Sequence, residues 1–181
     1  GLDPAKPVLL ITGGSQGARR LNELCAGAVA KFPEGIQVLH IAGALDFDRV
    51  SQIAGARANH HVLGFCDQMP AAYAVADLII SRSGASSLTE ISFAGLPSIL
   101  VPFPYAADDH QTRNAEVFER AGAAKLVQER NLDEGKLAAL ALSILNDPAT
   151  SERMAAAARS LAIPDAAERV CAAIESTFPN P

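Results

Sequence analysis

The stretch SRSGASSLTE, residues 81–90, decides the fold of this chain. It follows the short apolar run Leu78-Ile79-Ile80, which is typical of a buried strand, and it leads into a helical pattern with Leu88 and Ile91 on one face. The pattern predicts that this helix ends at Gly95. A strand, a turn of small residues and a helix N-terminus form a place for an anion, because free backbone N–H groups and the positive end of the helix dipole point into the turn.

The same pattern occurs earlier in the chain. An apolar run at residues 8–11 precedes the small-residue turn TGGSQGA at 12–18, and apolar residues then recur at helical spacing. Further runs typical of buried strands are followed by helical patterns; they occupy residues 36–42, 60–63, 98–101 and 125–127. Because strands and helices alternate, we expect an α/β fold: a Rossmann-like, doubly wound, mostly parallel sheet with helices on both faces.

Composition narrows the classes of function. The chain has 181 residues, of which 49% are hydrophobic and 19% charged, and this suits one globular domain with a full core. The formal net charge is −5 and no basic run is present, so we expect no nucleic-acid partner. Three scattered cysteines without C-x-x-C spacing indicate reduced thiols in a cytoplasmic protein. Residues 1–7 resemble a linker, so we expect residues 8–181 to be a single domain cut from a longer protein.

Topology predicts where a ligand binds. In the common doubly wound order the first and fourth strands are neighbours, and ligands bind at the carboxyl ends of the strands where the order reverses. The turns at 13–17 and 81–87 follow those two strands. Two helix N-termini that face one crevice favour a diphosphate.

Other interpretations of the sequence compete with a diphosphate site. A nicotinamide site needs G-x-G-x-x-G and an acid at the end of the second strand, whereas the glycines here read G-G-x-x-G and residues 40–43 are His-Ile-Ala-Gly. Asp46 and Asp48 have a D-x-D spacing that can hold a divalent ion, but acids are also ordinary at a helix start. His60 and His61 are adjacent on a strand, so their side chains diverge, and we expect both at the surface. No G-x-S-x-G motif supports serine hydrolysis.

Ser87 and Glu90 also permit a purely structural explanation. Their S-x-x-E spacing is that of a capping box, in which both side chains serve only the helix.

Four blocks together resemble the MurG family of bacterial N-acetylglucosaminyltransferases. They are GGSQGARRLN at 13–22, SRSGASSLTEISFAGLPSILVPFP at 81–104, DHQTRNA at 109–115 and AGAA at 121–124. The resemblance covers nearly the whole chain and corresponds to the C-terminal half of a GT-B glycosyltransferase. It implies that this half binds the donor UDP-N-acetylglucosamine (UDP-GlcNAc), whose sugar is transferred to lipid I to form lipid II in peptidoglycan synthesis.

The resemblance also implies roles for individual residues. Ser15 and Gln16 would face the diphosphate and the sugar, Cys66 would contact uracil through its backbone, and Gln111 would hold hydroxyls of the GlcNAc ring. Glu90 would accept hydrogen bonds from the ribose hydroxyls. The turn and first helical residues would line the nucleotide; they are Arg82, Ser83, Gly84, Ala85, Ser86, Ser87, Leu88, Thr89 and Glu90.

Three of the residues in these blocks have competing roles. Arg82 either reaches a phosphate or pairs with an acid. For His110 and Asn114, helix capping and packing are favoured over ligand contact.

The sequence departs from the full pattern of the MurG family. The N-terminal half, with the acceptor site for lipid I and the expected general base, is missing, so we expect no catalytic residue here. No metal and no cofactor are implied, and the full-length protein is expected in the cytoplasm at the inner face of the cell membrane. Two alternatives share the architecture: half of another UDP-sugar glycosyltransferase, including one that works with a separate partner protein, and a UDP-GlcNAc 2-epimerase.

Overall fold

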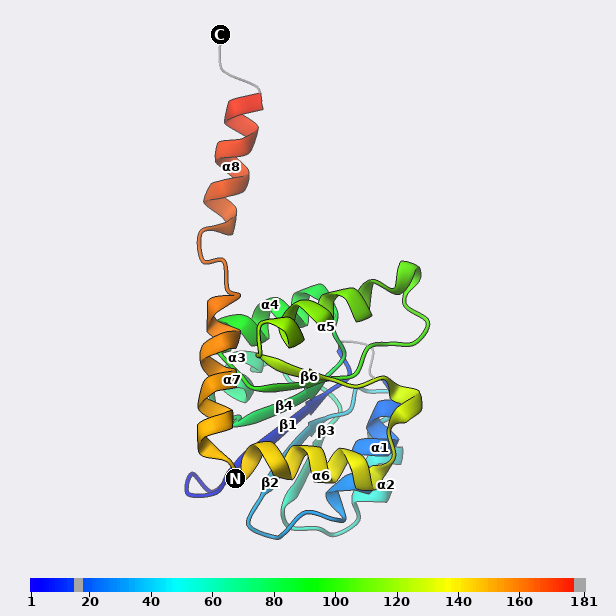
Figure 1. The fold of residues 1–181 in the computed structure, drawn as a ribbon. Coiled ribbons are helices and arrows are strands. Elements are labelled where there is room, and N and C mark those ends of the chain that lie inside the picture. Colours follow the sequence, from blue (N-terminus) through cyan, green and yellow to red (C-terminus); the bar gives the residue numbers. More distant parts are fainter. Residues whose placement is uncertain (15–17, 178–181) are drawn as a thin grey trace.

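The computed structural model describes residues 1–14 and 18–177, and its centre is a six-stranded parallel sheet (Figure 1). The strand order is β3-β2-β1-β4-β5-β6, so the order reverses between β1 and β4 as expected for a doubly wound sheet. The strands are β1 (Val8–Thr12), β2 (Gln37–Ile41), β3 (His60–Leu63), β4 (Leu78–Ser81), β5 (Ser98–Leu100) and β6 (Ala124–Leu126).

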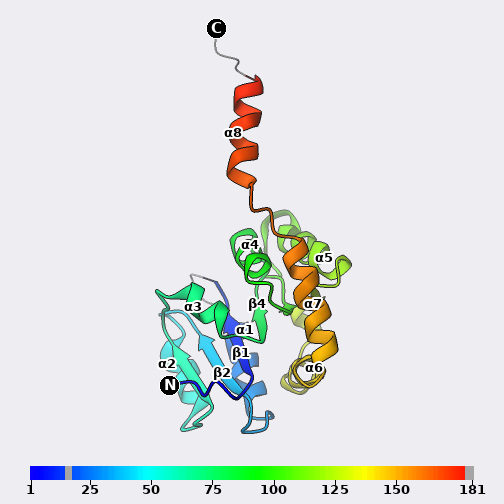
Figure 2. The same cartoon turned by 90° about the vertical axis from the view of Figure 1, so that its left-hand side faces the viewer.

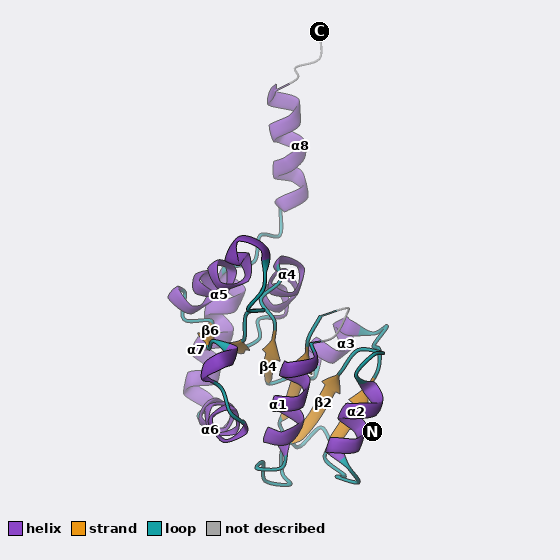
Figure 3. Cartoon of the chain, turned by 90° about the vertical axis from the view of Figure 1, so that its right-hand side faces the viewer, coloured by secondary structure: helices purple, strands orange, loops and turns teal. Residues whose placement is uncertain are grey.

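Helices cover both faces of the sheet (Figures 2 and 3). On β1, the side chains of Leu9 and Ile11 enter one core cluster and that of Leu10 enters the other, because successive residues of a strand point to opposite faces. The first cluster packs against α1 (Arg19–Val29) and α6 (Glu134–Leu145). The second packs against α3 (Met69–Ala74), α4 (Ala85–Ala94) and α5 (His110–Arg120). The remaining α-helices are α2 (Phe47–Ala54), α7 (Pro148–Ser160) and α8 (Ala166–Thr177), and short 3₁₀ turns occupy Ala107–Asp109 and Glu129–Asn131.

The helix boundaries follow local signals in the sequence. Gly95 adopts the left-handed conformation after α4 (φ 66°), which confirms the predicted end of that helix. Asp133 caps α6 by accepting a hydrogen bond from the backbone N–H of Lys136 at 2.8 Å, and Asp147 caps α7 in the same way through Thr150. The hydrogen bond from the Lys136 N–H lowers the pKa of the Asp133 carboxyl, and hydrogen bonds from the Thr150 hydroxyl and then the Thr150 N–H lower the pKa of Asp147.

The two ends of the chain differ in their contacts with the sheet. Asp3 lies in the segment expected to be a linker, and it exchanges hydrogen bonds with Gln37 at 2.6 and 2.8 Å, so this segment is tied to β2. By contrast, α8 stands away from the sheet, and its side chains, including Val170 and Ile174, are exposed (Figures 1 and 2). Within residues 1–14 and 18–177, none of the helices has the length and apolar character that crossing a membrane requires.

A buried polar chain joins α1, β2, β3 and the start of α2. The Asn22 amide donates to Ala42 O at 2.8 Å and to Asp46 Oδ2 at 2.9 Å, so its oxygen faces His40 Nε2 at 3.1 Å. His40 Nε2 is therefore a donor, and His40 Nδ1 accepts from His60 Nε2 at 3.3 Å. His60 is 7% exposed, so the expectation that it lies at the surface is wrong: the ring stacks on His40 in the interior.

Both rings are held neutral. Burial, and then the neighbouring His60, lowers the pKa of His40 to about 3. Burial lowers the pKa of His60 to about 4, with smaller contributions from the charges of His61 and Arg57. A proton added to His40 Nδ1 would face the N–H of His60, and a proton added to His60 Nδ1 would find no partner among the described residues.

The chain is expected to lose stability between pH 6.5 and pH 5. A histidine whose folded-state pKa is depressed contributes fully above its unfolded pKa of about 6.5, and this contribution falls as the pH drops. For His40 the loss at pH 5 is about 2 kcal/mol, measured as a falling midpoint of urea unfolding. His40→Gln should flatten this slope, whereas His61→Gln, a change at the partly exposed neighbour, should keep it. Equal slopes for the two variants would contradict the assignment.

Candidate functional site

Two turns leave the sheet side by side at the point where the strand order reverses. In the register of β1 and β4, Thr12 pairs with Ser81, so both strands end at the same level. The first turn leads to α1 and the second to α4, and among the described residues no side chain caps the N-terminal N–H groups of either helix. Ser15 and Gln16 lie outside the described residues. The predicted adjacency of β1 and β4 at the point where the strand order reverses is therefore confirmed.

The first turn of α4 is open to a ligand. Gly84 is the N-cap residue, with extended φ and ψ of −66° and 146°. Ser87 and Glu90 thus lie inside the helix, one turn beyond the positions of a capping box, and the capping-box explanation is wrong. The N–H groups of residues 85–87 precede the first intrahelical hydrogen bond, which Leu88 N donates to Gly84 O.

A cavity of about 310 Å³, here called the strand-end cavity, lies beside this turn. Its walls come from the segments that follow β1, β2 and β3, together with one face of α3 and the start of α4. The lining residues are Thr12, Gly14, Ile41, Gly43, Gly64, Phe65, Cys66, Met69, Tyr73, Ser86, Ser87 and Glu90. The structure thus brings together Cys66, Ser86, Ser87 and Glu90, four of the predicted site residues, from two distant parts of the sequence.

Glu90 reaches the strand-end cavity from α4 and already has a partner. Its Oε2 accepts a hydrogen bond of 2.6 Å from the Tyr73 hydroxyl on α3. Burial raises the pKa of Tyr73, and the hydrogen bond to Glu90 and its charge add to the shift. The phenol therefore stays protonated as a donor over the physiological range.

A second cavity of about 460 Å³, here called the loop cavity, lies on the other side of the same turns. It is bounded by the start of α1, the loop after β5, and α5. Its lining residues are Gly13, Ala18, Arg19, Arg20, Arg82, Phe103, Pro104, Tyr105, Gln111 and Glu129. Arg19 and Arg20 at the start of α1 are exposed, and Arg19 pairs with Glu23 at 3.4 Å, so the positive edge of this cavity rests mainly on Arg20.

The Arg82 side chain is buried in the interior of the protein. One terminal nitrogen, Nη1, donates to the carbonyls of Val101 and Pro102 at 3.0 Å each, and the other, Nη2, pairs with Glu129 Oε2 at 2.6 Å. The guanidinium carbon lies 5.6 Å from the centre of the Phe103 ring. Of the two roles left open for Arg82, the structure places its guanidinium against an acid and the backbone.

Gln111 and its neighbours hold the second turn in place. Gln111 Oε1 accepts from the backbone N–H of Ser83 at 3.3 Å and of Phe103 at 3.0 Å, while Ser83 Oγ donates to Gln111 O at 2.8 Å. Gln111 lines the loop cavity, and its side-chain NH₂ has no hydrogen-bond partner among the described residues. Asn114 donates to Ser83 O, which supports the packing role favoured for it. His110 Nδ1 lies 2.8 Å from Ala107 O in the preceding 3₁₀ turn, a contact with a carbonyl that does not cap the N–H groups of α5.

Five described residues of the predicted set line neither cavity: Ser83, Gly84, Ala85, Leu88 and Thr89. Ser83 and Gly84 form the turn between β4 and α4. The Leu88 side chain is 6% exposed and belongs to the core between α4 and the sheet. Ala85 is exposed at the helix start, and the hydroxyl of Thr89 donates back to Ala85 O at 3.0 Å. Only the backbone groups of these residues are placed to contact a ligand bound at the turn.

Asp46 and Asp48, the D-x-D pair, have different surroundings. Asp46 is buried at the start of α2 and accepts from Asn22, while Asp48 lies exposed one residue into the helix. Among the residues that the structure describes, no group of three or more His, Cys, Asp and Glu side chains is placed to hold a metal ion.

Tyr73 and Glu129 take part in the site although the sequence did not point to them. They lie 17 and 47 residues from their partners Glu90 and Arg82, and no local motif links such pairs. Arg19 and Arg20 carried a weak signal, since basic residues near a helix start are unfavourable for the helix dipole and thus indicate another role.

The chain matches known proteins over nearly its whole length. Residues 8–170 match the family model of the glycosyltransferase family 28 C-terminal domain. A relative from Solibacter usitatus is 43% identical over 171 residues, which cover 92% of this chain and 46% of the relative. Its name is UDP-N-acetylglucosamine–N-acetylmuramyl-(pentapeptide) pyrophosphoryl-undecaprenol N-acetylglucosamine transferase, and a relative with the same name from Solidesulfovibrio magneticus is 40% identical over 94% of this chain and 50% of its own length.

Solved structures agree with the sequence relatives. The crystal structure of Acinetobacter baumannii MurG superposes with a TM-score of 0.87 at 35% identity, covering 94% of this chain and 52% of that one. A UDP-GlcNAc 2-epimerase from Neisseria meningitidis shares the fold alone, with a TM-score of 0.65 at 14% identity. The chain spans about half the length of the curated relatives it matches. Over residues 8–170, this chain belongs to the glycosyltransferase family 28 C-terminal domain family.

Proposed function

We propose that this chain is the donor-binding half of an inverting glycosyltransferase that moves GlcNAc from UDP-GlcNAc to lipid I, forming lipid II. The main support is the position of Glu90, one turn into an uncapped helix and at the wall of the strand-end cavity. The uridine occupies this cavity, with its ribose hydroxyls donating to Glu90. The diphosphate lies across the two helix N-termini, and the sugar lies in the loop cavity beside Gln111.

The chemistry assigned to this half concerns the leaving group. The acceptor hydroxyl attacks the anomeric carbon from the face opposite UDP, through a transition state that resembles an oxocarbenium ion. Negative charge grows on the departing diphosphate. In this proposal the N–H groups at the starts of α1 and α4, which precede the first hydrogen bonds within those helices, stabilise this charge without reorganisation. We propose on these grounds that donor binding requires no metal and no cofactor.

The rest of the reaction belongs to the other half of the protein. Lipid I and the group that deprotonates its hydroxyl are supplied by an N-terminal acceptor domain. The full-length protein acts at the cytoplasmic face of the cell membrane, where its acceptor is held by a lipid.

Glu90→Ala is expected to weaken UDP binding roughly 10–100-fold. A hydrogen bond to a charged group is worth about 1.5–3 kcal/mol, which corresponds to that loss. The binding of 2′,3′-dideoxy-UDP should change little, since this ligand lacks the hydroxyls that Glu90 accepts from. Isothermal titration calorimetry with both ligands, in EDTA, measures the effect and tests metal independence at the same time.

The outcome separates two roles for the residue. Equal losses for UDP and its dideoxy analogue would mean that Glu90 has only a structural role, such as its hydrogen bond to Tyr73. An affinity of the unmodified chain that collapses in EDTA and returns with magnesium would contradict the metal-free proposal.

A further inference from the structure

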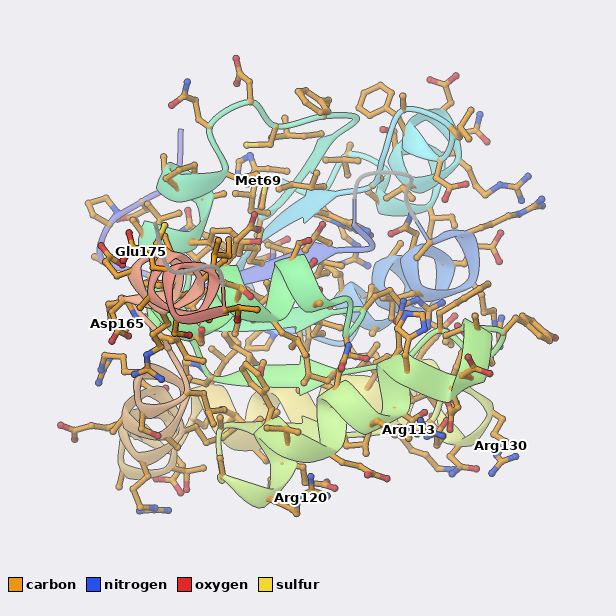
Figure 4. All side chains as sticks on the ribbon, turned by 90° about the horizontal axis from the view of Figure 1, so that it is seen from above. Met69, Arg113, Arg120, Arg130, Asp165 and Glu175 are labelled. Atoms are coloured by element: carbon orange, nitrogen blue, oxygen red, sulfur yellow. The ribbon has the colours of Figure 1, made fainter. Side chains whose placement is uncertain are left out.

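One hydrogen bond separates two cavities of this protein. The strand-end cavity lies on one side of the Tyr73–Glu90 pair, and a third cavity of about 460 Å³ lies between α3 and α4 on the other. Met69, Tyr73 and Glu90 line both cavities, so the three residues form their common wall. Met69 lies at the start of α3 and is labelled in the view from above (Figure 4).

The two partners in this hydrogen bond differ in how firmly they are held. The Tyr73 side chain is 8% exposed and packs in the same core cluster as Ile41 and Leu88. Glu90 lies on the exposed side of α4, and Tyr73 is its one hydrogen-bond partner among the described side chains. The buried Tyr73 ring therefore fixes the geometry of this hydrogen bond, and the bond orients the Glu90 carboxylate.

A carboxylate held in this way keeps free acceptors for a diol. An ionised carboxylate offers about four lone-pair sites on two oxygens, and the Tyr73 hydroxyl uses one of them on Oε2. The other sites, including both on Oε1, remain available. Two vicinal hydroxyl groups of a ribose need two acceptors.

We infer that Tyr73 is a positioning residue for ribose recognition: its hydroxyl fixes the Glu90 carboxylate, before the nucleotide binds, in the orientation that accepts from the 2′- and 3′-hydroxyl groups. This inference rests on the proposed binding of UDP in the strand-end cavity. It explains why a buried phenol points at an acid on a neighbouring helix. Without this hydroxyl, an exposed glutamate must lose its rotamer freedom when the ligand binds.

Tyr73→Phe is expected to weaken UDP binding about 2- to 12-fold, which corresponds to about 0.5–1.5 kcal/mol for ordering one flexible side chain. The affinity for 2′,3′-dideoxy-UDP should stay the same. Calorimetric titration of the unmodified chain and the variant with both ligands measures this selectivity, which loss of packing alone would not alter. The ring that fills the core is kept, so the variant is expected to fold.

A double-variant cycle tests whether Tyr73 acts through Glu90. In the Glu90→Ala background, Tyr73→Phe should have no further effect on UDP binding. A loss that persists in this background would show that Tyr73 contacts the nucleotide itself, and an equal loss for both ligands would show a packing role; either result overturns the inference. Unchanged UDP affinity in Tyr73→Phe overturns it as well but leaves the proposed function intact, whereas an unmodified chain that binds no UDP refutes both.

Discussion

Replacing Arg82 with leucine is expected to lower the free energy of unfolding by about 3–5 kcal/mol. The change leaves the Glu129 carboxylate, whose side chain is 15% exposed, without its partner at 2.6 Å. It also removes the donor that serves the carbonyls of Val101 and Pro102. An uncompensated, largely buried charge costs more than an exposed one, because water replaces the lost partner only in part. Urea unfolding of the 181-residue chain, followed by circular dichroism, measures the loss.

A cycle with Glu129 separates the ion pair from packing. In Arg82→Leu/Glu129→Leu no buried charge is left unpaired, so the double variant should recover a large part of the stability that either single variant loses. Arg120 is a matched control, because it pairs with Glu116 at 3.6 Å on the surface of α5 (Figure 4). Arg120→Leu should cost less than about 1 kcal/mol. Similar costs for Arg82→Leu and Arg120→Leu would contradict the structural role given to Arg82.

Much of the fold can be predicted from the sequence because its signals are local. Buried parallel strands are short apolar runs, and the runs at 8–11 and 78–80 match β1 and β4. Gly95 and Asp133 mark helix ends through the backbone conformation and the capping bond that those residue types provide. Adjacency of β1 and β4 then follows from the common doubly wound order.

The contacts that shape the site were harder to predict from the sequence, because they join residues that lie far apart in it. Pairing of Tyr73 with Glu90 depends on how α3 packs on α4, and burial of Arg82 depends on the loop near Glu129. His60 shows the same limit: its strand position was predictable, but its stacking on His40 depends on the register of β2 and β3. Motifs place residues on elements, whereas side-chain partners are decided by packing between elements.

The chain by itself is expected to bind UDP-GlcNAc and to transfer no sugar. In the proposed function, the two cavities at the strand ends hold the donor and its leaving group, and Glu90 lines one cavity and Gln111 the other. Holding two reactants in the right geometry accounts for roughly 7–11 kcal/mol of a barrier. Half of a cleft can hold only the donor. The predicted absence of transfer therefore follows from the proposed division of labour between the two halves.

Restoring the missing half should restore transfer. The 181-residue chain, mixed with a separately produced N-terminal half of a relative or fused to it, is expected to move radiolabelled GlcNAc from UDP-GlcNAc to a lipid I analogue. Each half alone should leave the label in the donor. Glu90→Ala in the fusion serves as the matched control, because it should lower transfer at limiting donor while saturating donor recovers part of the rate. Transfer catalysed by the purified chain alone would contradict the proposal, since the acceptor would then have to bind within this half.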